Sequence, residues 1–332
     1  MNAIHDPWLP VRFPDGSTRE VGLREALVHA HEIEGLADMR PLGPPTQLRL
    51  LVALVQRVFV PEDAGDWLAL WRVGKFDPAP LDVYFGRWKQ RFELLDEETP
   101  FLQVGGDFSI GNTNTIDKLS HDVDHAAFNR LFSHSDGPQV PTTQAEVLRR
   151  LVIAQACALG GGVSGNPIWN GAVFARPNFS HAPLATSAIV TLEGMGLFQT
   201  VLLNLVPQAT LGDLPVWERD LSETYFNQTA ANGPLDRLTS LSRMVRLIPD
   251  ADGVSISRCY YTQGRGLAEA GADTMVSYRQ DDRLGLLPCR ISESRASWRD
   301  LHALLAFSSA PPGPALRARV LRFVGERIDG GD

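Results

Sequence analysis

Apolar and polar positions alternate with two different periods along this chain, and together the two patterns predict a mixture of short strands and packed helices. Residues 6–21 predict a strand, a tight polar turn and a returning strand. Residues 23–33 keep one face apolar at helical spacing, which is typical of an amphipathic helix. Residues 47–60 are apolar almost all round, so we expect a core helix that ends at Pro61.

Further along, the pattern predicts shorter elements separated by glycine and proline. Aromatic residues between positions 66 and 92 predict two helices that pack by their aromatic faces, with base stacking as the alternative. Other predicted strands cover residues 101–104, 188–192, 254–261, 275–279 and 320–324, and other predicted helices cover residues 148–159, 197–206, 236–245 and 298–305. Because only a glycine turn follows the strand at 320–324, we expect the chain to be cut short.

The composition is that of a globular protein. Of 332 residues 44% are hydrophobic, enough for a sizeable core in one large or two medium domains. No run approaches the roughly 18 apolar residues of a membrane span, and residues 1–10 lack a signal-peptide pattern, so we expect a cytoplasmic protein. The three cysteines are far apart and lack CxxC spacing, which predicts neither a disulfide framework nor a cysteine zinc site.

Three consecutive glycines, Gly160, Gly161 and Gly162, follow the helix predicted at 148–159. Backbone without side chains can lie within hydrogen-bonding distance of another molecule, which favours a contact surface. The alternative is a helix C-cap followed by a buried loop. The glycines alone leave both interpretations open.

Local charge adds to the contact interpretation. The chain has a formal net charge of −8, but residues 149–179 contain Arg149, Arg150 and Arg176 and no acidic residue. A local basic patch beside bare amides suits a phosphate or a nucleic-acid groove. Any nucleic-acid contact is therefore expected to be focal.

A second cluster could carry metal chemistry. His121 and His125 are four residues apart, and Asp122 and Asp124 lie between them, a combination that could bind Zn or Mn and support a nuclease. The cluster lacks the internal glutamate of an HExxH motif, so a solvated polar patch is the alternative.

Two further patterns do not support an enzyme. Ser164 and His181 could form a nucleophile and base, but there is no GxSxG motif and no defined acid partner. The sequence GGGVSG lacks the GK[ST] of a phosphate-binding P-loop and the order of a dinucleotide-binding fingerprint.

Several motifs resemble one family, the large subunit (CasA) of the type I-E CRISPR surveillance complex Cascade. Individually they are short, but they occur in the family's order over about 200 residues. They are DPWLPVR at 6–12, FELL at 92–95 with PFLQ at 100–103, AFN at 127–129, LGGG at 159–162 with SG at 164–165, and TVLLN at 200–204.

The resemblance implies a DNA-binding subunit without enzymatic activity, cofactor or metal. Such a subunit recognises the protospacer-adjacent motif (PAM) of foreign double-stranded DNA, helps the guide RNA to invade the duplex, and receives the helicase-nuclease. The residues implied in contact with the minor groove are Gly160, Gly161, Gly162 and Ser164, together with Arg265 in place of the family's lysine finger. Phe128 and Asn129 are implied in contact with the guide RNA or a neighbouring Cascade subunit.

The resemblance also implies the architecture. We expect residues 1–332 to form the mixed α+β N-terminal domain of the CasA type, with a flexible loop at about 105–130 and a glycine loop at 160–166. We also expect this sequence to lack the C-terminal four-helix bundle of the family. We expect the isolated chain to be a monomer that assembles with the other Cascade subunits and does not bind membranes.

Overall fold

Short strands and helices alternate along the chain. The computed structural model describes residues 1–120, 142–162, 165–174, 180–209, 211–268, 273–290, 304 and 315–330. The helices are α1 (Leu23–Val28), α2 (Gly43–Phe59), α3 (Ala64–Val73), α4 (Pro78–Trp88), α5 (Gln144–Cys157), α6 (Leu197–Leu203), α7 (Glu223–Asn227), α8 (Pro234–Leu238) and α10 (Arg319–Gly330), with 3-10 turns η1 (Lys89–Phe92), η2 (Ile116–Leu119) and η4 (Val216–Glu218). The strands are β1 (Leu9–Arg12), β2 (Thr18–Val21), β3 (Gly35–Leu36), β4 (Phe108–Ser109), β5 (Asn114–Thr115), β6 (Ile168–Trp169), β7 (Ala172–Val173), β8 (Arg243–Pro249), β9 (Ile256–Gln263), β10 (Tyr278–Asp281), β11 (Gly285–Pro288) and β12 (Ala315–Leu316).

The described strands pair into small antiparallel sheets. Their orders are β2-β1-β3, β4-β6-β7, β5-β9-β8 and β11-β10-β12. The predicted N-terminal hairpin is confirmed, with Val11 opposite Arg19. In the longest pairing, between β8 and β9, Val245 lies opposite Tyr261. This mixture of helices and small sheets confirms the predicted α+β class.

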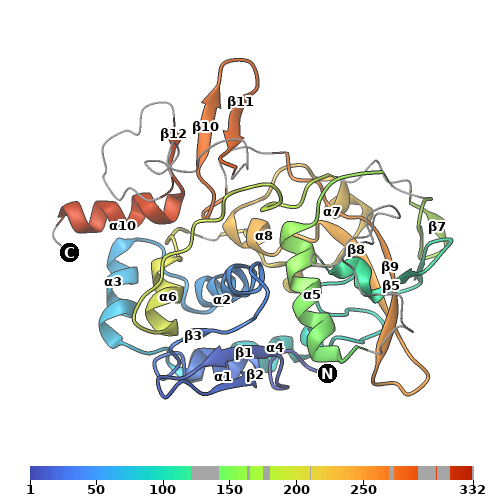
Figure 1. Ribbon diagram of the computed structural model, residues 1–332, viewed down its shortest axis with the longest axis horizontal. Coiled ribbons are helices and arrows are strands. Elements are labelled where there is room, and N and C mark those ends of the chain that lie inside the picture. The colour runs from blue at the N-terminus through green and yellow to red at the C-terminus, as the bar shows by residue number, and fades with distance from the viewer. Residues whose placement is uncertain are drawn as a thin grey trace, which may run out of the picture.

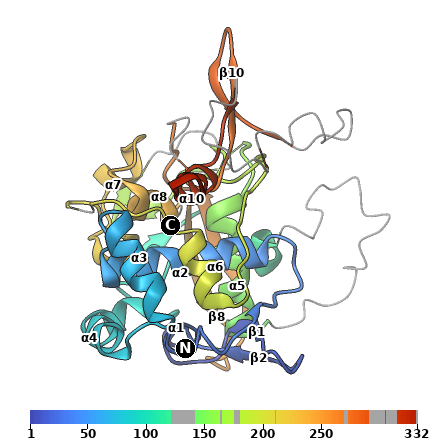
Figure 2. The same cartoon turned by 90° about the vertical axis from the view of Figure 1, so that its left-hand side faces the viewer.

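Helix α2 passes through the middle of the molecule in both orientations (Figures 1 and 2). Pro44 and Pro45 lie in its first turn, where the missing N–H costs no helical hydrogen bond, so the helix begins before residue 47. Its contacts are with α4, α5, α6, α8 and β3. Because neighbours surround it, apolar residues on all sides of α2 are buried, and the predicted core helix is confirmed.

The aromatic region forms the two predicted helices, and aromatic side chains of both face the core. The indole of Trp67 in α3 donates a hydrogen bond to the carbonyl of Leu202 in α6 (2.8 Å) and stacks on Trp71 at 5.1 Å between ring centroids. Phe85 of α4 is also buried and packs edge-on against Phe92. These contacts support core packing and leave the buried rings of Trp67 and Phe85 inaccessible for base stacking.

The strand predicted at residues 320–324 is wrong, because these residues lie in helix α10. Val320, Leu321 and Phe323 are buried, and Phe323 packs edge-on against Trp67 at 5.4 Å. Five residues are too few to separate a period of 2 from a period of 3.6, so the sequence pattern is ambiguous there. The contact with α3 favours the helix.

Other short predictions also differ from the structure. Residues 101–103 form a turn, and at 188–192 there is only an isolated bridge between Ile189 and Val276. The helix predicted at 236–245 ends with α8 at Leu238, and strand β8 begins at Arg243. Pairing with β9 makes residues 243–245 a strand, and the runs at 101–104 and 188–192 are too short for periodicity to define. Apart from Leu304, the helix predicted at 298–305 lies outside the described residues.

The first part of the predicted flexible loop has regular structure. Strand β4 pairs with β6, β5 pairs with β9, and Phe108 and Ile110 are buried. A few apolar side chains therefore anchor residues 105–120, which the low hydrophobic content did not suggest. Residues 121–130 lie outside the described residues. Within the part of the chain that the structure describes, no helix is long and apolar enough to cross a membrane.

Candidate nucleic-acid interface

Helix α5 ends before the three glycines, which we call the glycine segment (Gly160, Gly161 and Gly162). Its last residue is Cys157, and Ala158 follows in an extended conformation. Gly161 and Gly162 are exposed and have no positive φ, and a Cβ built on either meets no atom within 4 Å. The alternative of a C-cap followed by a buried loop therefore does not describe these two glycines. Packing inside the described part of the chain does not require glycine at either position.

Arg243, at the start of β8, fixes the backbone that leads into the glycine segment. Its buried guanidinium donates hydrogen bonds to the carbonyl oxygens of Ala158 (3.1 Å), Leu159 (2.8 Å) and Ser180 (3.0 Å). Its Nε donates to the hydroxyl of Tyr261 (3.0 Å). Burial lowers the pKa of Arg243, but an arginine remains charged, so these are charge-assisted bonds. They tie the end of α5 to the segment that begins at Ser180.

Gln263, the last residue of β9, and Gly264, which follows it, also hold this part of the backbone in place. The backbone at Gly264 passes so close to β8 that a Cβ there would lie 2.4 Å from the Leu241 carbonyl oxygen and 2.6 Å from the Arg243 nitrogen. Gln263 accepts a hydrogen bond from the Ser180 N–H at its Oε1 (2.7 Å). The β8–β9 pair therefore acts as the support on which the glycine segment rests.

His181 contacts the glycine segment directly. The N–H of Gly160 donates to Nδ1 of this exposed histidine (3.0 Å). Next to it, the N–H of Ala182 donates to the carbonyl oxygen of Ala158 (2.9 Å). Residues 180–182 thus run beside residues 158–160, far apart in sequence but paired in space.

The two described arginines of the predicted basic patch are neutralised. Glu146 forms ion pairs with Arg149 (3.0 Å) and Arg150 (2.7 Å). Arg149 also pairs with Glu20 (2.5 Å), and Arg150 with Asp117 (3.1 Å). The prediction of local positive charge is wrong for these two residues, because Glu146 precedes them on the same helix, just outside residues 149–179, and Glu20 and Asp117 come from distant parts of the chain. Electrostatic attraction is therefore not the main property of this surface.

The structure places Arg265 in the interior, just after β9. Its guanidinium forms an ion pair with Asp236 (2.6 Å), donates to the carbonyl of Gln228 (3.1 Å), and lies over the ring of Tyr225 at 4.8 Å. Burial lowers the pKa of Arg265, but the hydrogen bond and charge of Asp236 outweigh burial and the pKa is raised. In this conformation the side chain supports the fold, and contact with a DNA groove requires this ion pair to open.

The remaining predicted site residues lie outside the described part of the chain. They are Ser164, Phe128 and Asn129, the metal candidates His121, Asp122, Asp124 and His125, and Arg176 of the basic patch. Among the described residues, no group of three or more histidine, cysteine, aspartate or glutamate side chains is placed to hold a metal ion. The three cysteines are all described; they are buried and form no disulfide with one another.

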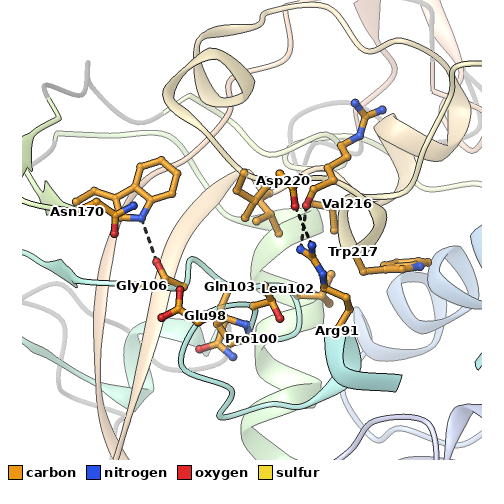
Figure 3. A pocket seen from close by; sticks show the side chains of 16 residues that line it. Arg91, Glu98, Pro100, Leu102, Gln103, Gly106, Asn170, Val216, Trp217 and Asp220 are labelled. Carbon is orange, nitrogen blue, oxygen red and sulfur yellow. Dashed lines mark hydrogen bonds and ion pairs between the residues drawn. The ribbon is translucent and has the colours of Figure 1, made fainter. Parts of the chain in front are cut away.

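A cavity of about 200 Å³ lies next to strand β6 (Figure 3). Arg91 on its wall donates to the carbonyl of Arg219 (3.1 Å) and to Asp220 (2.8 Å), and the indole of Trp169 donates to the carbonyl of Gly105 (3.0 Å). These polar groups already serve contacts within the protein. The cavity therefore provides less support for a ligand site than the open glycine segment does.

The sequence pattern did not predict the anchoring roles of Arg243 and Gln263, and it indicated His181 only as a base for Ser164. Arg243 begins an apolar strand, RMVRLI, and a charged residue among apolar neighbours is a weak signal of a buried anchor. Its partners Ser180, Leu159 and Ala158 lie 63, 84 and 85 residues away along the chain. At such separations no sequence pattern indicates the pairing.

Comparison with known proteins defines the class to which this fold belongs. Residues 2–329 match the family model of the CRISPR-associated protein Cse1 (CRISPR_cse1). The match covers nearly the whole chain, so the chain belongs to the Cse1 family.

Individual relatives agree with this assignment. The curated CRISPR-associated protein CasA/Cse1 of Thermus thermophilus is 34% identical over 317 residues, which are 92% of this chain and 60% of that protein. A crystal structure of Thermus thermophilus CasA has a TM-score of 0.82 at 32% identity, and the match covers 100% of this chain and 66% of that one. A chain of a solved CRISPR RNA-guided surveillance complex has a TM-score of 0.83 at 23% identity, covering 97% of this chain and 67% of that one, which shows likeness of fold. The chain thus spans 60% of the length of its curated relative.

Proposed function

We propose that this chain is a DNA-binding subunit of a type I-E Cascade complex, in which it recognises the protospacer-adjacent motif of foreign double-stranded DNA. Its proposed partners are the other Cascade subunits, the guide RNA and the helicase-nuclease effector. Membership of the Cse1 family and the likeness to a chain of an RNA-guided surveillance complex support the proposal. In this role the chain binds and positions DNA and leaves cleavage to the effector.

The open backbone of the glycine segment is the observation that carries the proposal. The minor groove is narrow and presents base-edge acceptors, so a protein reads it best where backbone or small side chains can approach closely. Gly161 and Gly162 are exposed with open space around them, while Arg243 holds the backbone immediately before them. A rigidly supported segment without side chains suits such an approach.

Replacing Gly161 with valine tests this role. The new side chain enters open space at a backbone without positive φ, so we expect the free energy of unfolding to change by less than about 0.5 kcal/mol. The β-branched side chain should nevertheless block approach to the base edges. Reconstituted Cascade with Gly161→Val should lose its preference for motif DNA over non-motif DNA, as measured by equilibrium binding.

A matched control is Gly86→Val on helix α4. Gly86 is also exposed and a Cβ there also meets no atom within 4 Å, but it lies on a different element. We expect this variant to bind motif DNA as the unmodified protein does. If Gly161→Val lowered the thermal midpoint but left motif discrimination unchanged, the glycine segment would have no part in recognition.

Ser164 and Arg265 belong to the proposed surface on the family resemblance. Ser164 follows the glycine segment closely in sequence, whereas Arg265 would reach DNA only after its ion pair with Asp236 opens. Arg265→Lys keeps the charge but loses the planar hydrogen-bonding group. A lower thermal midpoint with unchanged motif binding would assign Arg265 to the fold alone.

Phe128 and Asn129 are likewise proposed to contact the guide RNA or the neighbouring subunit. The competing metal-dependent nuclease would use the predicted histidine and aspartate cluster at 121–125. Metal analysis of the purified chain and a nuclease assay with and without chelator distinguish the two functions. We expect no stoichiometric metal and no cleavage, and reproducible chelator-sensitive cutting would overturn the binding role.

A further inference from the structure

The exposed imidazole of His181 is held against the glycine segment by backbone contacts on both sides. Before it, Ser180 accepts a hydrogen bond from Arg243 at its carbonyl oxygen (3.0 Å) and donates its N–H to Gln263 (2.7 Å). After it, the N–H of Ala182 donates to the carbonyl oxygen of Ala158 (2.9 Å). The backbone of His181 is therefore fixed, which keeps its ring beside Gly160.

The hydrogen bond from Gly160 selects one tautomer of the neutral ring. A backbone N–H can only donate, so Nδ1 of His181 must offer a lone pair (3.0 Å). The proton of the neutral ring then lies on Nε2, which becomes a donor. Among the described residues, the ring has no second hydrogen-bond partner, and the side chain is exposed.

We propose that His181 has two roles: it positions Gly160 through Nδ1, and it presents its Nε2–H to a hydrogen-bond acceptor of DNA bound at the glycine segment. This inference rests on the proposed function. The acceptor is either a base edge, adenine N3 or thymine O2, or a phosphate oxygen, since all of these accept from an N–H. A doubly protonated ring would donate from both nitrogens and could not hold Gly160.

Two substitutions separate the positioning role from the donor role. In His181→Asn the amide oxygen can take the place of Nδ1, but no group remains at the position of Nε2. His181→Ala removes both groups. In reconstituted Cascade we expect Asn to retain the thermal midpoint and to weaken motif-DNA binding about 5-fold to 10-fold, the loss of one hydrogen bond. Alanine should weaken binding further.

Comparing motif with non-motif DNA in the same experiment identifies the kind of acceptor. Loss of a base-edge contact reduces the preference of the Asn variant for motif over non-motif DNA. Loss of a phosphate contact weakens binding to both DNAs equally, and because a neutral imidazole releases no counterion the slope of log affinity against log salt should stay unchanged. If the Asn variant binds both DNAs as the unmodified protein does, the donor role is overturned.

A spectroscopic measurement tests the tautomer independently of DNA. In the full chain with ¹⁵N-labelled histidine, the signals lost in His181→Asn should be those of a ring protonated at Nε2 and unprotonated at Nδ1. The opposite tautomer would overturn the positioning role.

Measuring DNA binding of Gly161→Val in parallel separates this inference from the proposed function. If Gly161→Val keeps its discrimination between motif and non-motif DNA, the glycine segment itself has no part in recognition. If Gly161→Val loses this discrimination but the His181 variants bind DNA as the unmodified protein does, only the role of His181 is overturned.

Discussion

Glycine serves different purposes at Gly161 and Gly264. At Gly161 the backbone is open to solvent, and a Cβ would meet no described atom within 4 Å. At Gly264 a Cβ would lie 2.4 Å from the carbonyl oxygen of Leu241, which is closer than van der Waals contact allows. Glycine at Gly264 is therefore a requirement of packing, whereas packing among the described residues does not require glycine at Gly161.

We therefore expect Gly264→Ala to destabilise the protein by about 1–3 kcal/mol, the range of overpacked sites. The methyl group has to displace backbone of the β8 region, which also positions Arg243. Chemical denaturation of the variant measures the change, with Gly161→Ala as the matched control in open space. Equal unfolding midpoints for the two variants would contradict this account.

At the scale of the element, helix α5 connects the N-terminal hairpin to the glycine segment. Thr143 caps its first turn by accepting from the N–H of Glu146 (3.3 Å), and the side chain of Glu146 pairs with Arg40, Arg149 and Arg150. Burial raises the pKa of Glu146, but the hydrogen bond from Arg150 and the charge of Arg40 outweigh burial. The pKa is lowered from its ordinary value of 4.5.

This shift predicts how stability depends on pH. Because the folded-state pKa of Glu146 lies below 4.5, its contribution is fully present above that pH and is lost as the pH falls through the folded-state pKa. We expect Glu146→Gln to cost about 1–3 kcal/mol at neutral pH, since the amide carries no charge to pair with the arginines and only one of its two polar atoms accepts hydrogen bonds. The variant should also lose less stability than the unmodified protein on acidification below about pH 4.5. Chemical denaturation at neutral and acidic pH measures both effects, and an equal loss of stability in the two proteins on acidification would contradict this.

At the scale of the whole molecule, the net charge of −8 opposes general binding to DNA. Arg149 and Arg150, the two described arginines of the predicted basic patch, are already paired with carboxylates. The affinity of the isolated chain should therefore be weak and should come from a few contacts.

The salt dependence of binding tests this expectation. For duplex DNA each phosphate contact contributes about −0.9 to the slope of log affinity against log salt. We expect the isolated chain to be a monomer with a shallow slope, about −1 to −4. A fluorescence anisotropy titration over a salt series measures it, and light scattering gives the oligomeric state. A slope steeper than about −7, as for roughly eight contacts, would contradict a focal interface.

The sequence alone determined those features whose pattern is long or chemically distinct. Residues 47–60 are apolar almost all round, and burial on all sides is the favourable environment for such a helix, so the position of α2 in the core was predictable. The hairpin of β1 and β2 was predictable from its polar turn. The glycine segment was visible because three consecutive glycines are unusual beside a packed element.

Only the tertiary structure decided which side chains support that segment. Arg243 and Ser180 are 63 residues apart, and the sequence carries no pattern that pairs them. An arginine in a strand and an arginine beside a glycine look alike in sequence, yet Arg243 holds the glycine segment and Arg265 is buried against Asp236. The physical reason is that burial and ion pairing of a side chain depend on which distant segments fold against it, whereas helical and strand periodicity depend on neighbours along the chain.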